Sequence, residues 1–213
     1  MSIPSKIEDS LRFLKVSLQE FDQSASLLPS SRWMVEGMAS AGPVDEARTV
    51  VELGSGMGTI TEGILRRMRS DAKLFAIEID PALVEASSAR LQDPRLKFIQ
   101  GSAEHASELV REAGGEAPVD VAVSSVGLSM MPEDLRRRIV KAAADVIKPT
   151  GTLVHCGYLH AKWIVYSPTQ GIYRYDAEGL LREFFYDVRT SIVWLNLLPI
   201  KVYVCRAKRE INA

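Results

Sequence analysis

The sequence predicts an α/β fold in which a doubly wound parallel sheet carries helices on both faces. Five short apolar segments alternate with segments of helical period, the pattern of repeated strand–helix units. A glycine turn, residues 54–58, joins the first apolar segment, Thr49–Leu53, directly to a helix. A second strand then ends in an acid, Glu78, which lies 24 positions after Gly54. At about this spacing, such folds bind a ribose through an acidic side chain.

The elements follow in order along the chain. A helical extension, residues 1–40, precedes an α/β domain, residues 41–213, with no repeat or linker between them. The last core helix is predicted to stop at 148–151, where a lysine is followed by proline and glycine. A terminal strand pair is predicted at 189–195 and 201–207. The predicted core strands are 49–53, 73–79, 96–100, 119–124 and 152–158, and the predicted helices are 6–22, 32–40, 59–69, 81–91, 104–112 and 132–147.

Composition excludes several classes of protein. A chain of 213 residues with a net charge of −1 fits one α/β domain and has no overall attraction to nucleic acid. Its two cysteines, Cys156 and Cys205, lie in predicted strands, so we expect buried apolar residues and no disulfide. No Cys or His spacing suits a metal, and no secretory signal or 20-residue apolar span is evident. We therefore expect a cytoplasmic protein without a metal.

The glycine turn differs from the dinucleotide-binding fingerprint. That fingerprint, G-x-G-x-x-G, requires glycine where this chain has Thr59. An acid, Glu52, also precedes the turn, and a carboxylate repels a pyrophosphate but attracts a cation such as an ammonium. The turn therefore predicts a nucleoside ligand that carries positive charge. The alternative is a glycine turn in an unrelated α/β protein.

The segment Glu-Leu-Gly-Ser-Gly-Met-Gly, residues 52–58, resembles the first motif of class I S-adenosylmethionine-dependent methyltransferases. The resemblance implies S-adenosylmethionine as cofactor and S-adenosylhomocysteine as product. It also implies a Rossmann-like sheet of seven strands with a terminal antiparallel hairpin.

The cofactor is expected beyond the carboxyl ends of the strands. Glu78 is predicted to accept hydrogen bonds from the ribose, and Ile79 to cover one face of the adenine. Ser102 stands where methyltransferases usually place an aspartate for the adenine amino group; the alternative is that it caps a helix. The predicted cofactor-binding residues are Glu52, Gly54, Ser55, Gly56, Gly58, Thr59, Glu78, Ile79, Ser102, Ala103 and Ser124.

Three further segments bear on the acceptor. Leu28-Pro-Ser-Ser-Arg32, V-x-S-x-x-x-L after the fourth strand, and residues 193–203 resemble bacterial phospholipid N-methyltransferases and the related ornithine-lipid enzymes. The resemblance extends from about Phe13 to Arg206 and implies an aminolipid headgroup, phosphatidylethanolamine or ornithine lipid, as acceptor. The alternatives are a soluble small molecule or an RNA adenine, or cofactor binding without catalysis. Residues 124–132 lack the Asn-Pro and aromatic motif of nucleobase amine methyltransferases, so nucleic acid is not expected.

Candidate acceptor residues lie at strand ends and near the N-terminus. Tyr158 is predicted to line the site and accept from the amine, and His160 to relay the proton; the alternatives are a capping aromatic and an exposed loop histidine. Ser30, Ser31 and Arg32 are predicted to hold a lipid phosphate or carboxylate, with Lys201 as a further anion contact. For Ser30 and Ser31 the alternative is a helix cap.

The first predicted helix raises the question of membrane contact. Ile7, Leu11, Leu14, Leu18 and Phe21 form an apolar stripe, but residues 6–22 carry a net charge of −1. Interfacial helices usually have a basic polar face, so we expect weak, reversible association with the inner face of the cell membrane. The alternative is a helix that packs on the protein's own core. The aromatic segment 162–175 is predicted to form an acceptor lid or an interfacial aromatic contact; the alternative is that it packs over the sheet edge.

Overall fold

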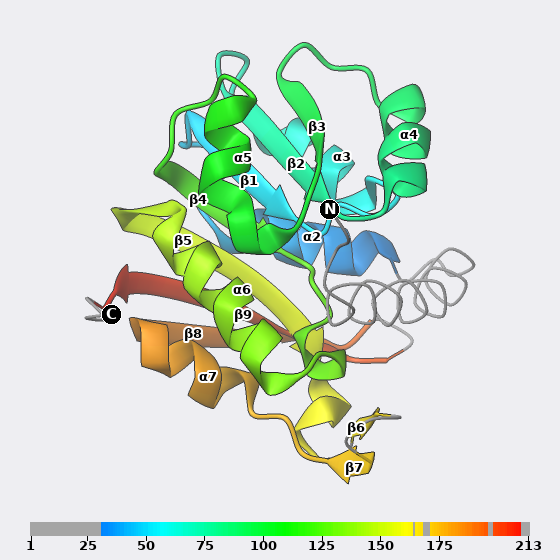
Figure 1. Cartoon of the computed structure of the whole chain (residues 1–213), viewed down its shortest axis with the longest axis vertical. Helices are drawn as coiled ribbons and strands as arrows, with labels where there is room; N and C mark the ends of the chain where they lie inside the picture. Colours follow the sequence, from blue (N-terminus) through cyan, green and yellow to red (C-terminus); the bar gives the residue numbers. More distant parts are fainter. Residues whose placement is uncertain (1–30, 164, 168–170, 196–197, 210–213) are drawn as a thin grey trace, which may run out of the picture.

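The computed structural model describes residues 31–163, 165–167, 171–195 and 198–209. Within these ranges the chain forms a seven-stranded sheet of order β3-β2-β1-β4-β5-β9-β8 (Figure 1). The first five strands pair in parallel, and β9 runs antiparallel to both β5 and β8. The predicted sheet with its terminal antiparallel hairpin is thereby confirmed. The strands are β1 Thr49–Leu53, β2 Lys73–Glu78, β3 Leu96–Gln100, β4 Val119–Ser124, β5 Ile147–Tyr158, β8 Phe185–Val193 and β9 Ile200–Lys208.

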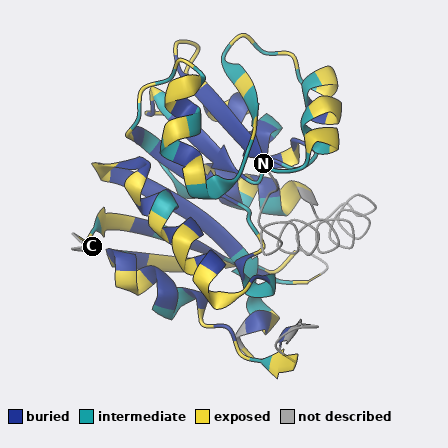
Figure 2. Cartoon of the chain, viewed as in Figure 1, coloured by how far each residue is buried: buried dark blue, intermediate teal, exposed yellow. Residues whose placement is uncertain are grey.

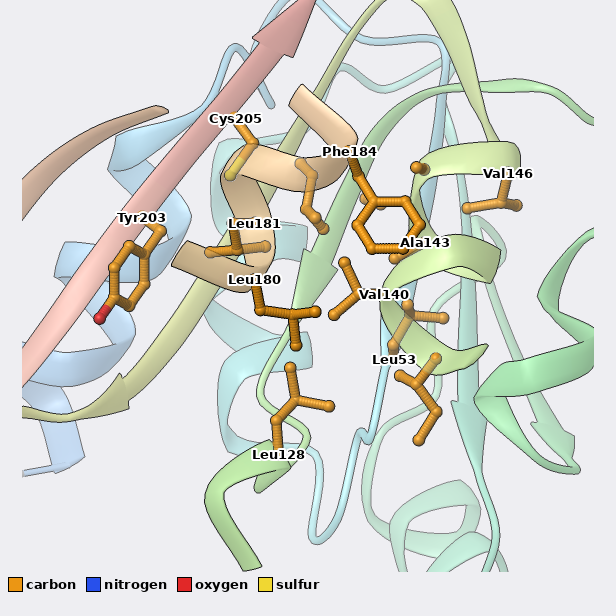
Figure 3. Packing of buried hydrophobic residues seen from close by; sticks show 14 of the residues in the cluster. Leu53, Leu128, Val140, Ala143, Val146, Leu180, Leu181, Phe184, Tyr203 and Cys205 are labelled. Carbon is orange, nitrogen blue, oxygen red and sulfur yellow. The ribbon is translucent and has the colours of Figure 1, made fainter. Parts of the chain in front are cut away.

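Each face of the sheet carries its own apolar core, because successive strand residues point to opposite faces. Buried strands lie beneath a shell of helices whose outer faces are exposed (Figure 2). On one face, side chains of α6 and α7 point toward each other, with Val140, Leu181 and Phe184 in the cluster (Figure 3). On the other face, α2 contributes Val35 and Met38 to the core beside α3. The α-helices are α2 Ser31–Ala41, α3 Thr59–Arg67, α4 Pro81–Arg90, α5 Ala106–Glu112, α6 Glu133–Asp145 and α7 Ala177–Phe184.

The structure describes the predicted N-terminal extension only from residue 31, and it describes both cysteines. The predicted helix 6–22 lies outside the described residues. No helix in the described part of the chain is long and apolar enough to span a bilayer. Cys156 and Cys205 are free and buried, as expected.

The predicted junction between the sixth helix and the fifth strand was wrong. Helix α6 ends at Asp145, and β5 begins at Ile147, five residues earlier than expected. Ile147 already pairs with Val119, whose N–H donates to the carbonyl of Val146. The pairing shifts register between Val119 and Val121, so the proline and glycine lie within an irregular strand start.

The segment between β5 and β8 has more structure than the sequence indicated. A 3₁₀ helix, Leu159–Lys162, is followed by two short paired strands, β6 Val165–Ser167 and β7 Gly171–Tyr173. Helix α7, which the sequence analysis missed, follows and leads directly into β8, which therefore begins at Phe185. Asp176 caps α7 by accepting from the Gly179 N–H at 3.0 Å. An N-cap aspartate before a Leu-Leu pair was the available signal.

Candidate active site

The glycine turn connects β1 to α3 in a conformation that depends on glycine. Gly54, Gly56 and Gly58 have φ of +77°, +51° and +77°, which other residues adopt at an energetic cost. A Cβ at Gly58 would also lie 2.8 Å from Leu91, whereas one at Gly56 would meet nothing within 4 Å. The turn is therefore closed toward α4 and open at Gly56, where a ligand can approach the backbone.

Glu52 is the most unusual group beside the turn. Its side chain is fully buried, and its Oε2 accepts from the Thr61 hydroxyl at 2.6 Å. Burial raises its pKa to about 8; the Thr61 hydrogen bond opposes this rise, and the charge of Glu78 adds to it. Glu52 Oε1 and the nearby Ser55 hydroxyl have no hydrogen-bond partner among the described residues. Buried polar atoms without partners are costly, and a ligand ammonium would provide a partner for the carboxylate.

Glu78 joins the end of β2 to the glycine turn. Its Oε2 accepts from the Gly56 N–H at 2.9 Å, and its Oε1 accepts from the N–H groups of Ile79 and Asp80 at 2.7 and 3.0 Å. An ionised carboxylate has about four acceptor positions, so three donors leave capacity for a ribose hydroxyl. The structure thus brings Glu52, Glu78 and the turn together, as predicted. The residues present fit S-adenosylmethionine, whose ammonium and ribose match these two carboxylates.

Two other predicted cofactor residues, Ser102 and Ser124, lie at the same sheet edge, and their hydroxyls already have partners within the protein. The Ser102 hydroxyl accepts from the Glu104 N–H at 3.3 Å and caps the 3₁₀ helix that begins at Ala103. The capping alternative is therefore observed, and the adenine contact stays a prediction. Ser124, at the end of β4, is buried with its hydroxyl 3.2 Å from Nδ1 of His155.

His155 was missed by the sequence analysis. It lies in β5 between Ser124 of β4 and Tyr203 of β9, and its ring stacks on Tyr203 with centroids 6.1 Å apart. Burial lowers its pKa to about 4, so the imidazole is neutral at physiological pH. No sequence signal marks it, because a histidine inside an apolar strand has no distinguishing spacing.

Tyr158, the last residue of β5, and His160, in the 3₁₀ helix that follows, come together at the carboxyl end of that strand. Their ring centroids are 5.3 Å apart, with Tyr158 partly buried and His160 exposed. Burial raises the pKa of Tyr158 to about 12, with a smaller effect from Cys156. The Tyr158 hydroxyl is therefore neutral near pH 7, and its predicted role toward an amine stays a prediction.

Of the predicted anion contacts, Arg32 and Lys201 have described side chains, and each has a partner within the protein. Ser30 and the side chain of Ser31 lie outside the described residues. Arg32, at the start of α2, places its guanidinium 4.9 Å from the Trp33 ring centre. Lys201 donates to Glu178 Oε2 at 2.7 Å and lies over Tyr203. Its ammonium is thus already paired with a carboxylate, and its role toward a substrate stays a prediction.

Comparisons with known proteins identify a family model and a relative that this chain resembles. Residues 50–151, from β1 into β5, match the family model described as a methyltransferase domain. The ornithine lipid N-methyltransferase of Singulisphaera acidiphila is 28% identical over 206 residues, which covers 96% of this chain and 99% of that protein.

Two solved structures share the fold. One is the 1,6-didemethyltoxoflavin-N1-methyltransferase of Burkholderia thailandensis with bound S-adenosylhomocysteine, with a TM-score of 0.63, 18% identity and coverage of 98% of this chain and 92% of that chain. The other is an S-adenosylmethionine-dependent methyltransferase of Leishmania major, with a TM-score of 0.70, 15% identity and coverage of 93% and 82%. At these identities the likeness concerns the fold alone.

Proposed function

We propose that this chain, a class I S-adenosylmethionine-dependent methyltransferase, methylates the amine headgroup of a membrane lipid. The observation that carries the proposal is the similarity over almost the whole chain to an ornithine lipid N-methyltransferase. Ornithine lipid is accordingly the first proposed acceptor, and phosphatidylethanolamine is the second.

We assign proposed roles to the residues on the cofactor side and on the acceptor side of the site. When bound, S-adenosylmethionine supplies an activated methyl group on its sulfonium. Glu52 receives the ammonium of the cofactor, Glu78 its ribose and Ser102 its adenine. The acceptor amine, with a pKa of about 10, must lose a proton before it reacts. Tyr158 accepts a hydrogen bond from this amine and orients it, and the exposed His160 passes the proton to solvent.

Exposed apolar side chains support a lipid acceptor. Val193 of β8 pairs with Ile200 of β9, which pairs with Tyr158, so the residues after Val193 extend beyond the sheet edge that bears the candidate site. There Trp194 is 65% exposed and Leu195 63% exposed. Trp33, on the neighbouring α2, lines a shallow groove with them. Tryptophan favours the membrane interface, and we propose weak peripheral attachment through this edge together with residues 6–22.

The direct test is incubation of the purified protein with labelled S-adenosylmethionine and total bacterial lipid, followed by chromatography. We expect label in an aminolipid. Purified ornithine lipid and phosphatidylethanolamine in vesicles then identify the acceptor. Methylation of a soluble fraction, with no labelled lipid, would contradict the proposal and favour a small-molecule methyltransferase.

Replacing Trp194 and Leu195 together by aspartate is expected to weaken vesicle binding in flotation by about 5-fold or more, because exposed apolar area is lost. The affinity for S-adenosylhomocysteine should stay unchanged. Tyr186→Asp is the matched control, since Tyr186 is 64% exposed at the opposite end of β8. Equal flotation of both variants would argue against attachment at this edge.

A further inference from the structure

Every carbonyl oxygen from Gly54 to Gly58 accepts a hydrogen bond. Two donors are backbone groups: Gly58 N–H donates to Ser55 at 2.8 Å, and Glu62 N–H donates to Gly58 at 3.1 Å. The other three donors are side chains from outside the turn. They are the Ser125 hydroxyl to Gly54 at 2.6 Å, the Ser87 hydroxyl to Gly56 at 2.7 Å and Arg90 Nη2 to Met57 at 2.7 Å.

The side-chain donors come from two separate elements that flank the turn. Ser87 and Arg90 lie one helical turn apart on α4, and Ser125 follows β4. Ser87 is fully buried, although helix α4 is otherwise largely exposed. Its hydroxyl is therefore directed into the structure, toward the glycine turn.

Glycine explains why such anchoring matters. A residue without a Cβ populates positive and negative φ about equally, so three glycines within five residues allow many turn conformations. A hydrogen bond to a carbonyl fixes the orientation of its peptide plane. The Gly54 and Gly56 carbonyls share their peptide planes with the N–H groups of the following residues, Ser55 and Met57. Anchoring them therefore fixes the two planes on either side of the Gly56 N–H, which donates to Glu78.

We propose that Ser87 and Ser125 are positioning residues, which hold the glycine turn in the conformation that binds the cofactor. Their effect passes through the turn carbonyls, and Arg90 contributes in the same way from the helix surface. The proposal rests on the cofactor assignment above. The anchors lower the conformational entropy lost on binding, because the turn is already ordered.

The test uses single variants of the full chain and three measurements: calorimetric affinity for S-adenosylhomocysteine, thermal midpoint, and hydrogen exchange across residues 54–59. Ser87→Ala and Ser125→Ala are each expected to weaken binding by roughly 5- to 10-fold, the value of about one net hydrogen bond. Exchange in the turn should become faster. Ser88→Ala is the matched control, since Ser88 is the neighbouring serine and its amide carbonyl, not its hydroxyl, makes the described contact. Ser125→Thr, which keeps the hydroxyl, should restore affinity.

The outcomes separate this proposal from the cofactor assignment. If the unmodified protein does not bind S-adenosylhomocysteine, the assignment itself fails, and the proposal fails with it. If the unmodified protein binds and both alanine variants bind equally well, while only their thermal midpoints fall, the serines are merely structural and the proposal is overturned. Should Ser87→Ala not fold, Ser125→Ala and Arg90→Gln decide by the same criteria, because both positions are less buried than Ser87.

Discussion

Replacing Glu78 with alanine is expected to weaken S-adenosylhomocysteine binding by about 100-fold or more. The carboxylate is 2% exposed and accepts from the turn at Gly56 and from Ile79 and Asp80. The change removes both the proposed ribose acceptor and the connection between β2 and the turn. Hydrogen bonds to a charged group contribute roughly 1.5 to 3 kcal/mol each. The loss of two such bonds, one to the ribose and one to the Gly56 N–H, accounts for this effect. Calorimetric titration of the folded variant measures it.

Two variants serve as controls for Glu78→Ala. Glu85→Ala removes an exposed carboxylate from α4 and should bind normally. Glu78→Gln keeps one acceptor oxygen and should have intermediate affinity. Normal binding by Glu78→Ala would show that the nucleoside binds elsewhere.

The second large effect is a pH dependence caused by Glu52. In the folded protein without cofactor, its pKa is raised from the ordinary 4.5 to about 8. Burial disfavours the ionised form of Glu52, so below about pH 4.5, where Glu52 is protonated in both states, its full contribution to the free energy of unfolding is present. As pH rises toward 8, Glu52 ionises in the unfolded chain but stays protonated in the folded protein, so the free energy of unfolding falls. The loss amounts to on the order of 5 kcal/mol.

Denaturant unfolding at several pH values from 5 to 8.5 measures this effect as the difference between the native protein and Glu52→Gln. We expect the free energy of unfolding of the native protein to fall relative to the variant as pH rises. His155, whose lowered pKa destabilises the fold below about pH 6.5, is present in both proteins and cancels in the difference. Saturating S-adenosylhomocysteine should reduce the slope, because its ammonium stabilises the ionised carboxylate. A difference that does not vary with pH would mean that Glu52 is ionised in the folded protein.

The sheet and the nucleoside half of the site were predictable because their signals are local. Strands 49–53, 96–100 and 119–124 match their predicted bounds, and Glu52, Gly56 and Glu78 come together through one strand–turn–helix–strand unit. Errors occurred where tertiary pairing overrides local signals. The proline and glycine after α6 indicated a loop, but pairing of Ile147 with Val119 extends the strand across them.

The sequence by itself determined the fold class, the charged nucleoside ligand and the two carboxylates that are proposed to hold it. Glycines, acid and strand ends there lie within 27 residues, so spacing along the chain sets their geometry. Only the tertiary structure decided which side chains hydrogen-bond to the glycine turn and which candidate side chains are already paired with another residue. Ser125 reaches Gly54 across 71 positions, Ser87 reaches Gly56 across 31, and Lys201 is paired with Glu178 across 23. Such contacts depend on how strands and helices are ordered around the sheet, and no local periodicity encodes that order.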